Sequence, residues 1–430
     1  MAVIISRLPF IWNSPGTDPD NWLVLSKGQK ISETGLYEAS RLPGYPVSEY
    51  LSSFFGTDAW WVLNVVTVLF SALSMVYFYK ILNSFNLKNK LIATIALAFT
   101  QGIFIASTVN MEYMWSLFFL LAGIFNLLNR KYLVSGILIG LMISTRFTNI
   151  VLLLPLLYLI IYLVKEKKAV NIFYFLLTSA LTFGVCFIPV FRTYGLDFFP
   201  SEIWGLPDIK TIVSFYTLYL YGVLGLVGLM IAVLFVLKNS RKVSEKAKQY
   251  KSLFIFCGLN IAITSAVYFR FPFESYYNLP LIPFLIIILN IVLFSEKIKK
   301  TVFLLLILSP FLLHVNMSKV HLEGSVFVTE KMETDIWNYT HQLHQKFSEK
   351  NTRRKVLVCG GFYYAYNYLY PQKITAGKVL LRPSEEEIKY YLSRRYTIYY
   401  PSDITDELKN IKNYDITKYG ESLLPALNEK

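Results

Sequence analysis

Long apolar runs separated by short, often basic, loops restrict the possible folds of this sequence more than any other feature. A lipid-embedded segment must satisfy its own backbone hydrogen bonds, so a run of this length is expected to cross the bilayer as a helix. The chain is 54% hydrophobic and only 16% charged, which soluble domains rarely reach. The sequence therefore predicts an all-α polytopic membrane protein with about 10–11 transmembrane helices. We expect spans near 58–82, 91–109, 112–129, 133–145, 149–164, 172–194, 211–237, 252–269, 279–294 and 301–317.

The distribution of Lys and Arg indicates an orientation. These residues concentrate in alternate loops, and such loops lie in the cytoplasm. The net charge of +14 is explained by this pattern, so it does not indicate nucleic-acid binding. The basic loops lie near 80–90, 130–131, 165–168, 238–251 and 297–300. The opposite loops and the C-terminal tail are then extracytoplasmic, and we expect an integral membrane protein, in the cell membrane, with its active site on that outer side.

The chain divides into four predicted regions. Residues 1–11 hold too few apolar residues to span, yet the topology needs a span before the first loop. We therefore expect 1–11 to be a truncated first transmembrane helix; alternatively, the span at 58–82 alone translocates the loop. A long extracytoplasmic loop with amphipathic helices and an acidic motif occupies 12–57, the transmembrane helical domain occupies 58–317, and a small α/β domain occupies 318–430.

The first loop is too long for a simple connector, which usually means function. It contains "TDPDNW", where Asp18 and Asp20 flank Pro19 at the start of a helix predicted over 19–32. Aspartate is favoured at helix N-termini, so capping is the simplest explanation. Capping explains one acid more easily than two, and we expect at least one of them to act in function.

From this loop onward the sequence resembles the C-class (GT-C) integral-membrane glycosyltransferases, in particular members related to mannosyltransferases and aminoarabinose transferases. The resemblance covers about residues 1–317. It rests on "RLPF…TDPDNW…TGLYEASRLPGYPV", "NMEYMWSLFFLLAGIF", "GILIGLMISTRFTNIVLLLP" and "VYFRFPFESYYNLPLIPFLIIIL". It implies many membrane helices, a long first external loop, and transfer of a sugar from a polyprenyl-phosphate carrier on the extracytoplasmic face.

Glu112 and Arg146 lie where the chain meets the outer membrane surface. An acid at this depth is costly unless it faces a polar cavity, so Glu112 is a candidate for binding sugar or acceptor. The alternative is an interfacial carboxylate in water. Arg146 could hold a lipid-linked phosphate through two parallel hydrogen bonds. The alternative is an arginine that extends to the interface.

The late loop "RFPFESYYNLP" and the motif "SRLPGYP" supply the other candidates. Arg270 could bind phosphate, and Glu274 and Tyr277 could bind sugar or acceptor; alternatively Arg270 and Glu274 form an ion pair that holds the loop. Arg41 and Tyr45 are further substrate-binding candidates, although Pro-Gly-Tyr-Pro is also typical of a turn.

The chemistry implied by the resemblance needs a base and a positive charge. One of Asp18 and Asp20 would take the proton of the acceptor, and position favours Asp20. Arg146 and Arg270 would stabilise the leaving phosphate, and attack from the opposite face would invert the sugar. We expect no cofactor and no metal, since no cluster has metal-ligand spacing, although a divalent cation at the acids is conceivable. The expected partners are a polyprenyl-phosphate-linked sugar and membrane lipids, with the acceptor unidentified and no nucleic acid.

Two other classes remain open. A polysaccharide polymerase or ligase has a similar number of spans, but its large functional loop is late in the chain. A secondary transporter would carry acids or broken helices near mid-membrane and inverted repeats. Here the acids cluster in external loops, which favours the glycosyltransferase.

Overall fold

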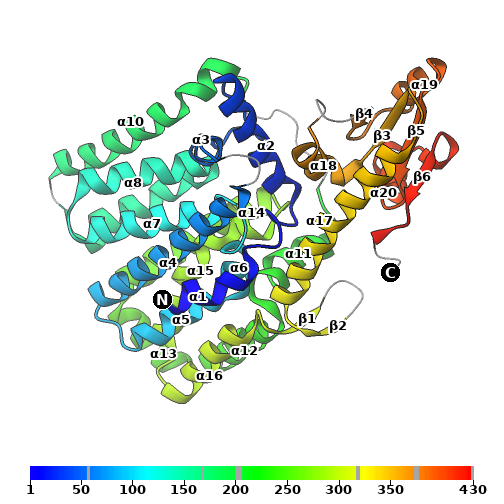
Figure 1. Ribbon diagram of the computed structural model, residues 1–430. Coiled ribbons are helices and arrows are strands. Elements are labelled where there is room, and N and C mark those ends of the chain that lie inside the picture. The colour runs from blue at the N-terminus through cyan, green and yellow to red at the C-terminus, as the bar shows by residue number, and fades with distance from the viewer. Residues whose placement is uncertain (56–58, 167, 199–205, 316–319, 372–376, 428–430) are drawn as a thin grey trace. The chain divides into compact units, whose positions relative to one another are not determined.

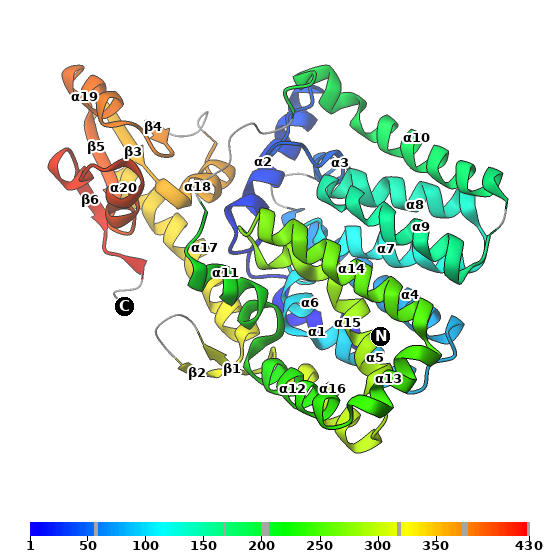
Figure 2. The same ribbon diagram turned by 180° about the vertical axis from the view of Figure 1, so that it is seen from behind.

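The computed structural model describes residues 1–55, 59–166, 168–198, 206–315, 320–371 and 377–427. The chain forms two compact units (Figures 1 and 2). The membrane unit consists of Met1–Ile11, Tyr37–Tyr50 and Val62–Thr329. The tail unit consists of Trp12–Leu36, Leu51–Trp61 and Glu330–Lys430. The first loop is thus shared between the two units, which its sequence did not indicate.

The membrane unit is almost entirely helical. Within the described residues, five helical segments are long and apolar enough to cross a membrane: α4 (Trp60–Ser84), α10 (Ala169–Tyr194), α12 (Leu218–Lys238), α14 (Lys251–Arg270) and the segment Ser275–Val292, formed by η5 (Ser275–Leu281) and α15 (Ile282–Val292). Shorter apolar helical segments are α5 (Lys90–Phe99), α7 (Tyr113–Leu128), α8 (Tyr132–Thr145) and Phe147–Leu163, which comprises η3 (Phe147–Leu152), α9 (Leu153–Tyr158) and η4 (Leu159–Leu163). The remaining elements are α1 (Ala2–Arg7), η1 (Leu8–Phe10), α3 (Pro46–Ser53), α6 (Gln101–Ala106), α11 (Ile209–Tyr216), α13 (Ser240–Gln249), α16 (Glu296–Leu308), β1 (Leu312–Val315) and β2 (Val320–Glu323).

Several predicted spans are interrupted in the structure. The segment at 91–109 breaks at Thr100, which is extended (φ −60°, ψ 134°), and the one at 211–237 breaks between α11 and α12. The prediction of a helix over 301–317 was wrong in its second half. Helix α16 ends at Leu308, and after Pro310 the chain pairs as the antiparallel hairpin β1–β2. Pro310 has no N–H to donate to a preceding carbonyl, so a regular helix cannot continue past it, although Ser309 before it still has helical backbone angles (φ −57°, ψ −41°). Residues 316 and 317 lie outside the described residues.

Polar side chains satisfy the backbone groups that these breaks release. Gln101 donates from Nε2 to the carbonyls of Leu218 and Tyr219, both at 3.0 Å, beside the positive-φ residue Gly222 of α12. Buried Arg7 of α1 donates to the carbonyl of Ala98, just before the break between α5 and α6. Inside a membrane an unpaired carbonyl has no water to bond, so such partners are what allow the breaks.

Helices α7, α8 and α10 lie side by side in both views (Figures 1 and 2). Gly136 and Gly140 of α8, four residues apart, face α10 closely. A Cβ atom at Gly136 would lie 2.5 Å from the carbonyl oxygen of Phe175, and one at Gly140 would lie 2.7 Å from that of Ser179. Small residues at this spacing let membrane helices pack through their backbones.

The tail unit is built on a parallel sheet in the order β4–β3–β5–β6, formed by β3 (Lys355–Val358), β4 (Lys378–Leu380), β5 (Thr397–Pro401) and β6 (Glu421–Leu424). Alternate residues of β3 and β5 enter two separate apolar clusters, so the sheet is covered on both faces. The other elements are α2 (Pro19–Thr34), α17 (Ser325–Glu349, shared with the membrane unit), η6 (Gly360–Phe362), α18 (Tyr363–Leu369), α19 (Glu385–Ser393), α20 (Ile404–Lys412) and η7 (Ile416–Lys418). The small α/β fold expected for the tail is therefore present.

Aromatic side chains join part of the first loop to the tail. Trp22 of α2 lies 5.9 Å from both Trp337 of α17 and Tyr368 of α18, measured between ring centroids. Trp60, at the start of α4, lies 5.6 Å from Trp337. Large aromatic rings bury much apolar area, which explains why helix α2 belongs to the tail unit.

We expect Gly136→Ala and Gly140→Ala each to lower the free energy of unfolding by roughly 1–3 kcal/mol, because α8 and α10 must separate to admit the methyl group. Gly184→Ala is the matched control, since a Cβ there has no neighbour within 4 Å. Thermal unfolding of the purified protein in detergent measures the difference. Equal transition temperatures for all three variants would contradict this packing.

Candidate functional site

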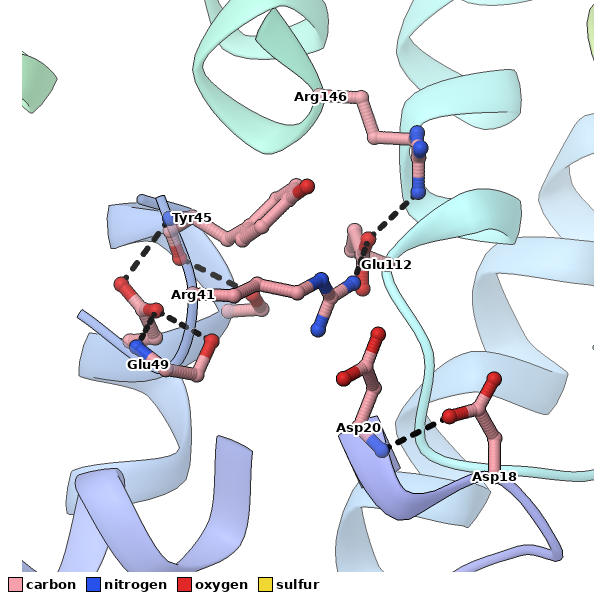
Figure 3. A network of polar contacts seen from close by, with 9 residues as sticks. Asp18, Asp20, Arg41, Tyr45, Glu49, Glu112 and Arg146 are labelled. Atoms are coloured by element: carbon pink, nitrogen blue, oxygen red, sulfur yellow. Dashed lines mark hydrogen bonds and ion pairs between the residues drawn. The ribbon is translucent and has the colours of Figure 1, made fainter. Parts of the chain in front are cut away.

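The candidate site in the membrane unit is centred on Glu112, which is 1% exposed at the N-terminus of α7. Its Oε1 accepts hydrogen bonds from Arg41 Nη2 at 2.8 Å and from Arg146 Nη1 at 2.7 Å (Figure 3). A buried carboxylate needs such partners, and a helix N-terminus also favours negative charge. The structure therefore brings together three of the sequence candidates.

The end of α8 explains how Arg146 reaches Glu112. Arg146 is the C-terminal cap of α8 and has an extended backbone (φ −144°, ψ 103°) before the chain turns into η3. Helices α7 and α8 are adjacent, so this turn lies beside the start of α7. The side chain is 5% exposed, and burial of the arginine is possible because Glu112 neutralises it.

Tyrosine rings surround the guanidinium of Arg146. Its central carbon lies 4.1 Å from the ring centroid of Tyr113, 4.6 Å from that of Tyr277 and 5.8 Å from that of Tyr45. Within the described chain, the guanidinium makes no hydrogen bond except the one to Glu112. It is therefore held in one orientation by a carboxylate and aromatic faces, with further N–H donors available to a ligand.

A second buried acid, Glu49, stabilises the conformation of the segment that carries Arg41 and Tyr45. Glu49 accepts hydrogen bonds from the hydroxyl of Tyr37, from the amide and hydroxyl of Ser40 at 2.6 Å, and from the amide of Tyr45 at 3.1 Å. Burial raises the pKa of Glu49, and these hydrogen bonds act in the opposite direction. The turn expected at Pro-Gly-Tyr-Pro is thus built around this carboxylate.

The side chain of Arg41 packs against the ring of Tyr45, with 4.2 Å between the guanidinium carbon and the ring centroid. Glu49 was not among the candidate residues predicted from the sequence. The one signal for it was an acid within the amphipathic stretch "PVSEYL", which an exposed helix face explains equally well.

The late loop contributes Tyr277 to the cluster but not Arg270. Glu274 caps η5, accepting from the amide of Ser275 at 2.8 Å, and Tyr277 in the same element lies against Arg146. Arg270 is exposed at the end of α14, with its guanidinium carbon 5.1 Å from the ring of Phe271.

Asp18 and Asp20 belong to the tail unit. Asp18 is the N-cap of α2, and its Oδ1 accepts from the amide of Asp20 at 2.8 Å (Figure 3). Helix capping thus explains Asp18, whereas Asp20 lies in the first turn of α2 and is not the cap. Helix α2, which carries Asp20, packs against α18, where burial and then the charge of Asp20 raise the pKa of Tyr364.

Metal-binding residues are not grouped in the described part of the chain, where no set of three or more His, Cys, Asp or Glu side chains could hold an ion. His314 and His321 face each other across the β1–β2 hairpin with ring centroids 5.9 Å apart. The His314 Nδ1 atom lies 2.9 Å from the hydroxyl of Ser325, so this histidine has a structural partner.

We expect Glu112→Ala to lower the free energy of unfolding by about 3–5 kcal/mol, because it leaves Arg146 buried without its carboxylate. Glu245→Ala is the control, since Glu245 forms a solvent-exposed pair with Arg241 at 3.8 Å and its loss should leave stability unchanged. Thermal unfolding in detergent distinguishes them. If both variants unfold at the wild-type temperature, Glu112 does not compensate a buried charge.

Comparisons with known proteins identify the fold. No protein-family model matches the sequence. No curated protein matches it either. The structure is similar to the crystal structure of ArnT from Cupriavidus metallidurans in the apo state, with a TM-score of 0.50 and 12% sequence identity. The match covers 100% of this chain and 89% of that chain. This chain therefore has a polytopic membrane fold like that of ArnT, with a small sheet-containing C-terminal region.

Proposed function

We propose that this protein is a membrane glycosyltransferase that moves a sugar from a polyprenyl-phosphate carrier to an acceptor on the extracytoplasmic face. One observation carries the proposal: a buried arginine, Arg146, is oriented by Glu112 and three tyrosines in a chain with a GT-C-like fold. Membrane location and many apolar helices fit a lipid-linked substrate. The donor would be a hexose-type sugar on the carrier, and the acceptor a lipid, glycan or protein.

The phosphate of the donor is assigned to Arg146 and Arg41. An arginine can grip two phosphate oxygens with parallel hydrogen bonds, and Glu112 holds both guanidinium groups in place by its Oε1. As the bond from sugar to phosphate breaks, negative charge grows on the leaving oxygen. Fixed guanidinium groups in a buried site stabilise that charge without rearranging. Arg270 remains a second candidate for this phosphate, and Glu274, Tyr277 and Tyr45 remain candidates for the sugar or acceptor.

Asp20 is proposed as the general base. In the transfer step its carboxylate would take the proton of the acceptor hydroxyl or amide. The acceptor atom would then form a bond to the anomeric carbon, and the phosphate would leave with the electron pair of the broken C–O bond. Attack opposite the phosphate inverts the configuration of the sugar. Asp18 is engaged as a helix cap, which supports Asp20 for this role.

Two other activities would also explain a membrane protein with many apolar helices and buried charges. A polysaccharide polymerase or ligase would also use lipid-linked sugars, and a secondary transporter would use intramembrane charges. The GT-C-like fold favours the glycosyltransferase over both.

We expect Asp20→Asn to reduce transfer from polyprenyl-phosphate sugars by roughly a hundredfold or more, the usual contribution of a general base. Asp18→Asn should retain most of the activity, because asparagine is also a good N-cap. Release of radiolabelled sugar from the carrier, measured with purified protein in lipid, separates the two. Full activity in Asp20→Asn would remove Asp20 from the reaction.

Arg146→Lys should raise the KM for the donor on the order of tenfold to a hundredfold, because lysine cannot form the paired hydrogen bonds. Arg192→Lys, at an exposed position in α10, is the matched control and should leave the KM unchanged. The same transfer assay over a range of donor concentrations gives both values. An unchanged KM in Arg146→Lys would argue that the phosphate binds elsewhere.

A further inference from the structure

Asn278 and Asn110 are two buried amides that the proposed reaction does not use. Asn278 is 0% exposed, and within the described residues neither its Nδ2 nor its Oδ1 has a hydrogen-bond partner. Asn110 is 2% exposed, and its Nδ2 likewise has none among these residues. The second oxygen of Glu112, Oε2, is also buried and unpaired in the described chain. Buried polar groups are nearly always hydrogen-bonded, so these atoms need an explanation.

Other buried asparagines of the membrane unit, such as Asn260 and Asn290, are paired at the Nδ2 end of the amide, although their Oδ1 atoms also have no partner among the described residues. Asn260 donates its Nδ2 to the carbonyl of Phe256 at 2.8 Å, and Asn290 donates to that of Lys88 at 2.8 Å. Their amides therefore hold the fold together. Asn278 does not, because both ends of its amide are unpaired in the structure described. Its burial is better explained by a ligand than by packing.

These unpaired groups come from two of the segments that contribute residues to the Arg146 site. Asn110 stands two residues before Glu112 in the turn that enters α7. Asn278 follows Tyr277, whose ring centroid lies 4.6 Å from the guanidinium carbon of Arg146. The ring of Tyr113 lies 5.4 Å from that of Tyr276, so the η5 turn packs against the start of α7.

The chemistry of the unpaired atoms selects a class of ligand. The two amide Nδ2 groups are donors, whereas Asn278 Oδ1 and Glu112 Oε2 are acceptors. An isoprenoid chain has no polar group to offer them, and an ionised phosphate has no proton to donate to the two acceptor atoms. A hydroxyl group both donates and accepts, and a sugar ring carries several hydroxyls on one rim.

We propose that Asn110, Asn278 and Glu112 Oε2 form the subsite that recognises the hydroxyl groups of the sugar carried by the donor. This assignment rests on the proposed function, because it places the sugar beside the phosphate held by Arg146. Glu112 then serves two substrate groups, orienting the arginines with one oxygen and accepting a sugar hydroxyl with the other.

The test compares two probes, polyprenyl phosphate without a sugar and a panel of the same carrier bearing single hexoses or pentoses. Dissociation constants are measured in lipid nanodiscs for wild type, Asn278→Ala, Asn278→Ser and Asn110→Ala. Asn126→Ala is the matched control, since this asparagine lies near the C-terminal end of α7 and donates to the carbonyl of Ala122. Thermal unfolding of every variant is recorded in parallel, and Asn278→Ser serves where Asn278→Ala does not fold.

We expect the wild type to bind one sugar-bearing carrier more tightly than the bare carrier. Asn278→Ala should weaken that binding by about tenfold, the equivalent of one lost hydrogen bond, and leave the bare carrier unaffected. Asn278→Ala should also leave the unfolding temperature unchanged, whereas loss of an amide with a structural role would lower it.

Equal weakening of binding for both probes, or no weakening, overturns the subsite. Wild type that binds the bare carrier without favouring any sugar also overturns it but leaves the phosphate site intact. Wild type that binds neither probe overturns the proposed function as well.

Discussion

The buried charge of Glu112 is the constraint on which the rest of the candidate site depends. A carboxylate without water must be neutralised and hydrogen-bonded, and here one oxygen accepts from both Arg41 and Arg146. The end of α8 meets this requirement. There, the extended backbone of Arg146 directs its side chain toward the start of α7. The segment that carries Arg41 must also be held in position. Glu49 holds it by accepting hydrogen bonds from Tyr37, Ser40 and Tyr45.

Burying charged and polar groups in a membrane unit costs free energy, and such a cost usually indicates a function. Ionisable residues within membrane proteins usually mark a substrate path, and unpaired buried amides add to that cost. Both features occur together at the start of α7 and in η5, where Asn110, Glu112, Tyr277 and Asn278 lie. The proposed sugar phosphate would supply anionic oxygens for the arginine and hydroxyls for the amides. The proposed substrate thus follows from the polar atoms that the fold leaves unsatisfied.

The sequence predicted the membrane fold, the helices of the first loop and tail, and the residues Glu112 and Arg146 as separate candidates. It could not show that they bond, because they are 34 positions apart and join only through helix packing. The capping role of Asp18 was predictable from local spacing. Glu49 and Asn278 were not, since nothing local distinguishes a buried acid or amide from an exposed one. The end of α16 was missed because apolar residues continue past Pro310, and hydrophobicity alone does not distinguish helix from hairpin.

The central claim is that Arg146 holds the phosphate of a lipid-linked sugar. The most direct measurement is an electron cryomicroscopy structure of the wild-type protein in nanodiscs with a polyprenyl-phosphate sugar. The account predicts density for phosphate within hydrogen-bond distance of the Arg146 guanidinium, with the sugar toward Asn278 and the Arg146–Glu112 contact retained. A phosphate bound away from Arg146, with the tyrosines still closed around an unliganded guanidinium, would contradict the account.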